Sequence, residues 1–142
     1  MNIGAFERHG VAVDRQFSAV PPVRVDRHRV LQILINLLRN AKYALDDSKR
    51  TDKRITISIL AAKEGSVQIV IADNGIGISS ENLTRVFAHG FTTREQGHGF
   101  GLHSGALAAR AMGGSLSVAS PGIDCGATFT LELPIAPTTS RT

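Results

Sequence analysis

The sequence DNGIGI, residues 73–78, follows directly on SVQIVIA, residues 66–72. SVQIVIA is short, apolar and rich in β-branched residues, which predicts a buried strand. This strand therefore ends in a carboxylate, Asp73, followed by two glycines in alternation. An acidic side chain next to bare backbone suits a calcium loop, a tight turn or a nucleotide base, and the rest of the chain has to distinguish among these.

Further strands are predicted on both sides of this one. RITISILAA (54–62) alternates apolar and polar residues and is joined to it by the turn KEG (63–65), so we expect a β-hairpin. SLSVAS (115–120) and ATFTLELP (127–134) predict a second hairpin, closed by the loop PGIDCG (121–126).

The first part of the chain predicts strands followed by a long helix. VAVDRQF (11–17) predicts a strand that a Pro-Pro pair ends, and VRVD (23–26) predicts a short second strand. Asp26 is expected to cap a helix over residues 27–47. The apolar positions of this helix recur at helical spacing, at Val30, Leu34, Leu37, Ala41, Ala44 and Leu45.

Two more helices are predicted in the second half of the chain. Residues 79–87 begin with a serine cap, and residues 100–114 end in Gly113 and Gly114. Between them, AHGFTTREQGHG (88–99) is polar, rich in glycine and long for a plain connection, which predicts a lid. We expect residues 88–98 to be mobile when no ligand is bound.

The order of these elements predicts an α/β fold. We expect a two-layer sandwich, in which a mixed sheet of about five strands is covered on one face by three helices. The 142 residues suffice for one domain with a sizeable core. We assign residues 11–134 to this domain, residues 1–10 to the end of an upstream helix or a linker, and residues 135–142 to a flexible tail.

Composition narrows the class of protein. No apolar run approaches about 18 residues and no signal-peptide pattern is present, so we expect no direct membrane contact. Cys125 alone cannot form an internal disulfide, which favours a reducing, cytoplasmic setting. The net charge is +4, but the basic residues between Arg24 and Arg54 are mixed with aspartates. We interpret them as a solvated face, with a docking surface or a phosphate-attracting field as the alternative, and expect no nucleic-acid partner.

The segment GHGFGLHSG (97–105) opens the last predicted helix. Glycines at such a position let backbone N–H groups approach an anion, and a helix N-terminus favours negative charge, so phosphate is the natural ligand. The segment lacks the preceding strand of a dinucleotide fingerprint and the Gly-Lys-Ser/Thr of a Walker loop. A glycine-rich hinge is the alternative interpretation.

Two asparagines in the long helix form a third chemical feature. Asn36 and Asn40 are four residues apart, so they lie on one face of the helix, about 6 Å apart along its axis. An amide oxygen is a suitable ligand for Mg²⁺, which commonly binds together with substrate phosphates. The alternative is that both amides hydrogen-bond to neighbouring loops.

The order NLLRNAKYAL (36–45), DNGIGI, FTTR (91–94), GHGFGL (97–102) and GATFTLEL (126–133) resembles the GHKL ATP-binding family. The details are most similar to the catalytic domain of a bacterial sensor histidine kinase, over residues 11–134. The resemblance implies an open-sided α/β sandwich that binds ATP and Mg²⁺ beneath a mobile lid.

The resemblance also implies roles for individual residues. Asn36 and Asn40 are the expected catalytic residues: Asn40 binds Mg²⁺ and Asn36 faces the phosphates. Asp73 accepts a hydrogen bond from the adenine amino group, and Gly75 and Gly77 let the backbone pass close to the base. The remaining expected contacts are Thr128, in the water network of the adenine, and the lid and phosphate residues Thr92, Thr93, Arg94, Gly97, His98, Gly99, Phe100, Gly101 and Leu102.

Four neighbouring positions complete the comparison with the family. Phe87 and Phe91 match the aromatic residues that anchor the lid. Tyr43 stands where many kinases carry Lys or Arg, which leaves open whether Tyr43 or Lys42 reaches the phosphates. His103 stands where Ala or Ser is more common, and packing or a supporting hydrogen bond is the expected use.

The expected reaction is phosphoryl transfer. Hydrolysing members of the family carry a glutamate where this chain has Asn36, and asparagine cannot accept a proton at neutral pH. None of the five histidines matches the family's phosphoacceptor, so we expect the acceptor on a dimerisation domain outside this chain, and a response regulator downstream. An anti-sigma-type serine kinase and a degenerate nucleotide-binding module are the alternatives, and the parent kinase could be anchored in a membrane.

Overall fold

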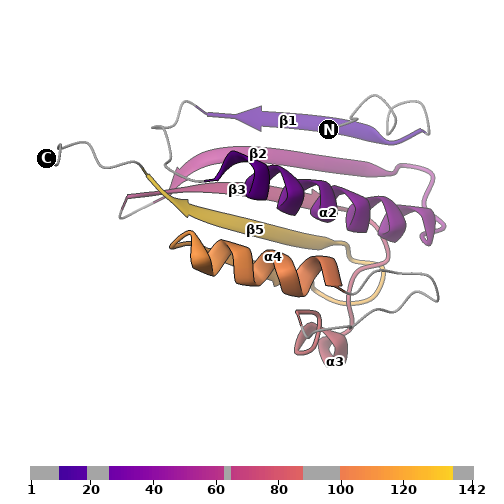
Figure 1. Ribbon diagram of the computed structural model, residues 1–142. Helices are drawn as coiled ribbons and strands as arrows, with labels where there is room; N and C mark the ends of the chain where they lie inside the picture. The colour runs from indigo at the N-terminus through magenta and orange to yellow at the C-terminus, as the bar shows by residue number, and fades with distance from the viewer. Residues whose placement is uncertain (1–9, 19–25, 63–64, 88–99, 136–142) are drawn as a thin grey trace, which may run out of the picture.

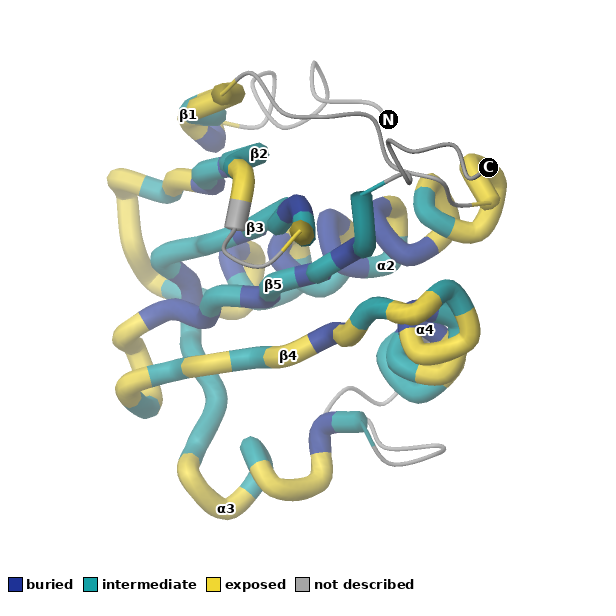
Figure 2. Tube along the Cα trace, turned by 90° about the vertical axis from the view of Figure 1, so that its left-hand side faces the viewer, coloured by how far each residue is buried: buried dark blue, intermediate teal, exposed yellow. Residues whose placement is uncertain are grey.

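The computed structural model describes residues 10–18, 26–62, 65–87 and 100–135. Its sheet has the order β1-β2-β3-β5-β4, in which β1 is parallel to β2 and every other pair is antiparallel (Figures 1 and 2). The sheet is therefore mixed, as predicted. The strands are β1 (Ala12–Phe17), β2 (Arg54–Ala62), β3 (Ser66–Asp73), β4 (Ser115–Ala119) and β5 (Ala127–Pro134).

Helices α2 (Arg27–Asp46) and α4 (Phe100–Ala111) pack side by side on one face of this sheet (Figures 1 and 2). Helix α3 (Ser80–Leu83) is a single turn, and Figure 2 shows it beyond the β4 edge. The predicted α/β sandwich is confirmed, and two helices of the described chain form its second layer. The helix predicted over residues 79–87 is shorter than expected: after its cap at Ser79 it ends at Leu83.

Strand alternation decides which side chains form the core. In β5 the residues with odd numbers are buried and those with even numbers are only half-buried. Odd-numbered residues of β2 and β3 pair with them across the sheet, for example Ile71 with both Ile57 and Phe129. Because successive side chains of a strand point to opposite faces, the odd-numbered apolar residues all lie under the helices. The other face carries polar residues such as Ser58, Gln68 and Thr130, and no helix of the described chain covers it; we call it the open face.

Helix α2 begins and packs as its sequence predicts. The Asp26 side chain accepts hydrogen bonds from the backbone N–H groups of His28 (3.0 Å) and Arg29 (3.3 Å), which are unpaired at the start of a helix. Six apolar side chains at helical spacing are buried against the sheet. They are Ile33, Leu34, Leu37, Leu38, Ala41 and Leu45.

Most predicted elements occur at the expected positions. The strands over 54–62 and 127–134 have the predicted limits, and Gly113 ends the α4 segment with a positive φ of 83°. The predicted strand at 23–26 and the predicted lid at 88–99 lie outside the described residues, except that Asp26 is described as the cap of α2. The terminal segments 1–9 and 136–142 also lie outside them, so the proposed limits of the domain stay predictions.

Candidate functional site

Asp73 is the last residue of β3, and its side chain lies on the face covered by the helices. It pairs with Ile55 of β2 and Ala127 of β5, and both of these neighbours are buried. Its Oδ1 accepts a hydrogen bond from the backbone N–H of Gly75 at 2.8 Å. Burial raises the pKa of Asp73 from 3.8 to about 6, and hydrogen bonds from the backbone of Gly75 and Ala127 partly oppose this rise. The site therefore holds an oriented, half-buried carboxylate that is mostly ionised at pH 7.

Gly75 allows the segment after β3 to pass beneath the end of α2. A Cβ atom at this position would lie 2.6 Å from both the carbonyl carbon and the carbonyl oxygen of Ala44. The same oxygen accepts a hydrogen bond from the backbone N–H of Ile76 at 3.1 Å. Only glycine permits this approach, because any side chain would push the segment away from the helix. The expected passage of a base close to Gly75 stays a prediction.

Gly77 has a φ of +73°, which an L side chain rarely adopts. A Cβ atom there would also lie 2.1 Å from the carbonyl oxygen of Gly122, in the loop between β4 and β5. The N–H of Asp124 in that loop donates to the carbonyl of Ile76 at 2.6 Å. The loop 120–126 therefore packs directly against residues 74–78, which follow Asp73 and are called the glycine segment below.

Asn36 and Asn40 are both half-buried and lie one turn apart on α2. Ala44 follows one further turn along the same side of the helix, where it contacts Gly75. Asn40 is therefore one helical turn, about 6 Å, from the segment that follows Asp73. Within the described part of the chain neither amide has a hydrogen-bond partner, so both can contact a ligand.

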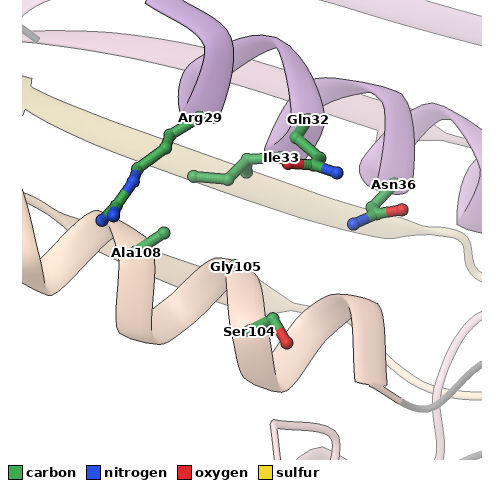
Figure 3. A pocket seen from close by; sticks show the side chains of 7 residues that line it. All are labelled: Arg29, Gln32, Ile33, Asn36, Ser104, Gly105 and Ala108. Carbon is green, nitrogen blue, oxygen red and sulfur yellow. The ribbon is translucent and has the colours of Figure 1, made fainter. Parts of the chain in front are cut away.

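A cavity of about 450 Å³ lies between α2 and α4. Figure 3 shows Arg29 and Asn36 extending from α2 toward α4. The helices approach closely here because Gly105 has no side chain: a Cβ atom would lie 3.3 Å from the Leu116 side chain and 3.7 Å from that of Ile33. This cavity is called the groove below, and Asn36 lies between it and Asn40. The lining residues are Arg29, Gln32, Ile33, Asn36, Ser104, Gly105 and Ala108.

Helix α4 begins at Phe100, so the predicted phosphate-binding residue Gly101 lies in its first turn. Leu102 lies in its first turn and packs, half-buried, against the core, as Phe87 does from before the lid segment. The Nδ1 atom of His103 lies 3.0 Å from the carbonyl oxygen of Phe87. A carbonyl only accepts hydrogen bonds, so this nitrogen carries the proton. His103 therefore joins the chain on the two sides of residues 88–99, which is the supporting hydrogen bond expected for it.

Several predicted ligand-binding residues lie outside the described part of the chain. For Phe100 and Gly101 the structure describes only the backbone, as the first residues of α4. The expected contacts of these positions, and the lid itself, stay predictions. The residues outside are Phe91, Thr92, Thr93, Arg94, Gly97, His98 and Gly99.

Thr128 does not join this cluster, which corrects the assignment from sequence. The β5 residue that pairs with Asp73 is Ala127. Because side chains alternate along a strand, Thr128 points to the open face, where its neighbours across the sheet are Ala72 and Ala119. The Thr128 side chain cannot reach a base held by Asp73 on the other face. The contribution of β5 is instead the backbone of Ala127, which hydrogen-bonds to Asp73.

The choice between Lys42 and Tyr43 follows from helix geometry. Lys42 comes two residues after Asn40 and so lies on the far side of α2, where its Nζ is 3.6 Å from Asp46 Oδ2. Tyr43 comes three residues after Asn40, is half-buried and lies nearer the asparagine side. Of the two, Tyr43 is the residue adjacent to the site.

Metal-binding clusters and membrane spans are both missing from the described residues. Among those residues no group of three or more His, Cys, Asp or Glu side chains could hold a metal ion. No helix in that part of the chain is long and apolar enough to cross a membrane.

A comparison with protein families matches residues 25–137 to the histidine kinase-, DNA gyrase B- and HSP90-like ATPases. The chain belongs to this family. It is 35% identical over 119 residues to the sensor histidine kinase ZraS of Escherichia coli K12, and these residues cover 83% of this chain and 24% of ZraS. It is 38% identical over 118 residues to the two-component sensor PprA of Pseudomonas aeruginosa, covering 80% of this chain and 13% of PprA. The chain thus spans a quarter or less of these curated relatives.

Solved structures of histidine kinases have the same fold. The catalytic domain of histidine kinase ThkA in a nucleotide-free form has a TM-score of 0.77 at 24% identity, covering 94% of this chain and 84% of that one. Full-length ShkA in complex with AMPPNP has a TM-score of 0.81 at 26% identity, covering 98% of this chain and 28% of ShkA. The resemblance to histidine kinase catalytic domains that the sequence motifs indicate is confirmed.

Three residues of this ATPase-family site were not predicted from sequence. Ala44 supplies the carbonyl that receives the glycine segment, and Ala127 supplies a backbone hydrogen bond to Asp73. The Ser120 hydroxyl hydrogen-bonds to the backbone of Ile78, after Asp73 in the chain, and of Gly126, just before β5. Strand alternation could have identified Ala127 once the pairing of β3 with β5 was known, whereas Ala44 and Ser120 act through contacts that carry no local sequence signal.

Proposed function

We propose that this chain is the ATP-binding catalytic domain of a two-component sensor histidine kinase. It binds Mg-ATP and transfers the γ-phosphate to a histidine on a dimerisation domain outside this chain. The observation that carries the proposal is the arrangement around Asp73. A carboxylate held by two backbone hydrogen bonds lies beside the one face of α2 that presents Asn36 and Asn40.

Asp73 suits adenine because of its charge and its fixed position. The amino group of adenine is a donor, and a carboxylate accepts such a hydrogen bond strongly. Guanine presents a carbonyl oxygen at the same position, which a carboxylate repels. Half-burial strengthens both effects, since fewer water molecules compete for the carboxylate. The glycine segment and the loop 120–126 extend the site on either side of this carboxylate.

The described residues fit a magnesium ion that binds together with phosphates. Mg²⁺ prefers oxygen ligands and retains several water molecules, so one amide oxygen from the protein is sufficient when phosphates supply others. Asn40 offers such an oxygen, because its side chain has no hydrogen-bond partner among the described residues and lies one turn from the Gly75 contact. When bound, the ion would neutralise and orient the phosphates.

Asn36 favours transfer over hydrolysis. Its amide can orient a phosphate or an incoming group, but it cannot take a proton from water. It also borders the groove between α2 and α4 (Figure 3). The protein's contribution is therefore to position the nucleotide, while a separate partner provides the nucleophile.

The partners belong to the parent protein and are part of the proposal. The relatives named above are sensor kinases several times longer than this chain. By analogy the parent supplies the phosphoacceptor histidine on a dimerisation domain, and a response regulator receives the phosphate from it. The cytoplasmic setting of the chain also stays a prediction.

The test combines binding with transfer. The isolated chain should bind ATP in the presence of Mg²⁺, measured by calorimetry, and should not label itself with γ-labelled ATP. Mixed with the dimerisation domain of its parent, it should transfer label in an acid-labile form, as expected for phosphohistidine. Label on a histidine of the isolated chain would contradict the proposal, and acid-stable label on a partner would favour a serine kinase instead.

A further inference from the structure

Ser120 follows β4 directly, and its half-buried hydroxyl contacts several backbone groups. The oxygen lies 2.6 Å from the carbonyl oxygen of Gly126 and 3.0 Å from the N–H of Ile78. The N–H and carbonyl of Gly122 lie at 3.3 Å. A hydroxyl has one proton and two acceptor positions. The short contact places the proton toward Gly126, and the N–H groups of Ile78 and Gly122 fill the acceptor positions, so the hydrogen-bonding capacity of Ser120 is fully used.

The groups that Ser120 joins belong to two segments on either side of Asp73. Ile78 ends the glycine segment, whereas Gly126 precedes Ala127 in β5. Gly126 packs on the backbone of Asp73: its φ is +77°, and a Cβ atom there would lie 2.1 Å from the Asp73 carbonyl oxygen. The N–H of Gly126 also donates to the carbonyl of Gly75 at 3.2 Å.

These two segments supply both backbone hydrogen bonds to the Asp73 carboxylate. One comes from Gly75, three residues before Ile78, and the other comes from Ala127, directly after Gly126. The hydrogen bonds of Ser120 within the described chain reach neither the carboxylate nor the long helix with its asparagines. Its influence on a ligand therefore acts through the glycine segment and the start of β5, and so through the Asp73 carboxylate that these segments hold.

We propose that Ser120 is a positioning residue for adenine recognition, because its hydroxyl holds the glycine segment and the start of β5 together so that their N–H groups direct the Asp73 carboxylate toward the base. This inference rests on the proposed function, since the base is the adenine of ATP. Loss of the hydroxyl should affect the base end of the site and leave the phosphate end, formed by Asn36 and Asn40 on α2, as it is.

Calorimetry with ATP and with GTP, both with Mg²⁺, tests the proposal on this chain. Ser120→Ala should weaken ATP binding about 2- to 10-fold, the range expected for one hydrogen bond. GTP binding should not weaken, because the carboxylate repels guanine, so the ATP-to-GTP ratio should narrow by at least the same factor. Ser120→Thr keeps the hydroxyl and should restore the ratio. Ser117→Ala is the matched control, because Ser117 is exposed on β4, the strand that Ser120 follows, and it should leave both affinities unchanged.

A second measurement needs no nucleotide. The pKa of Asp73, followed by NMR, should rise further in Ser120→Ala, because hydrogen bonds from backbone N–H groups lower it. It should stay near the wild-type value in Ser120→Thr and Ser117→Ala. If Ser120→Ala does not fold, Ser120→Cys has nearly the same volume and only weak hydrogen bonding, and the same results are expected of it.

Two results would overturn the inference. One is an unchanged ATP-to-GTP ratio together with an unchanged pKa of Asp73 in Ser120→Ala. The other is an equal loss of ATP and GTP affinity, which would mean that Ser120 serves only the general stability of the domain. A wild-type chain that binds no ATP would instead refute the proposed function, and the pKa measurement would still decide whether Ser120 positions Asp73.

Discussion

Asp73→Asn should stabilise the nucleotide-free domain at neutral pH while it weakens ATP binding. The change removes the charge but keeps the size of the side chain and an oxygen that can accept the Gly75 hydrogen bond. In the folded protein the pKa of Asp73 is raised from 3.8 to about 6, because burial disfavours the charged carboxylate. A shift of about two pH units corresponds to about 3 kcal/mol, and partial exposure to solvent reduces this to about 2 kcal/mol.

The sign of the pH dependence follows from proton binding. Between about pH 4 and pH 6 the folded state binds more protons at Asp73 than the unfolded state does, so its contribution to stability falls as the pH rises. The whole penalty is present above pH 6. The stabilising effect of Asp73→Asn should therefore be about 2 kcal/mol at pH 7.5 and should shrink steadily as the pH is lowered toward 4.

The same substitution should reduce nucleotide selectivity. A hydrogen bond to a charged group contributes about 1.5–3 kcal/mol, or roughly 10- to 150-fold in affinity. With lone-pair repulsion added against guanine, the wild-type chain should prefer ATP over GTP by at least about 100-fold. The side-chain amide of the Asp73→Asn variant can turn and donate to the guanine oxygen, so the ratio should narrow more than ATP binding falls.

Urea unfolding between pH 4.5 and 7.5 measures the stability, and calorimetry with ATP and GTP at pH 7.5 measures the selectivity. Asp124→Asn is a suitable control because that carboxylate is exposed in the neighbouring loop. It should change stability at pH 7.5 by much less than Asp73→Asn does. The reasoning fails if Asp73→Asn changes stability equally at every pH, or if the wild-type chain binds GTP as well as ATP.

The remaining predictions concern other positions of the site. Gly75→Ala should lower the free energy of unfolding by about 1–3 kcal/mol, seen in urea unfolding, because its Cβ would lie 2.6 Å from the Ala44 backbone. Asn40→Ala should abolish the effect of Mg²⁺ on ATP affinity, measured by calorimetry with and without chelator, whereas Asn36→Ala should retain it and lose transfer to the acceptor. Thr128→Val should leave ATP affinity unchanged, because this side chain lies on the open face; a clear loss would show that the face assignment is wrong.

Much of the fold was predictable because it is recorded in local patterns. Strict alternation over 54–62 and 127–134 predicted strands with the observed limits, since alternation reflects which side chains face the core. The cap at Asp26 and the helical spacing after it predicted α2 for the same reason. The motif order also identified the family, because the chemistry of phosphate and base binding needs glycine, asparagine and aspartate at particular points of the chain.

The error at Thr128 shows what local patterns leave undetermined. A motif assignment that is one residue out is invisible in the sequence, but in a sheet it moves a side chain to the opposite face. Only the pairing of Asp73 with Ala127 decides which of the two β5 residues belongs to the site. That pairing joins residues far apart in the sequence, and it depends on how the whole sheet assembles.

The sequence by itself determined the five strands that the structure describes, the two long helices and the chemical groups of the site. The tertiary structure decided which of these groups meet. It placed α3 beyond the β4 edge, brought the Ala44 carbonyl onto Gly75, and set the Ser120 hydroxyl between two segments around Asp73. The physical reason is that periodicity and capping depend on neighbours within a few residues, whereas these contacts depend on close approach between distant segments, which short-range patterns do not encode.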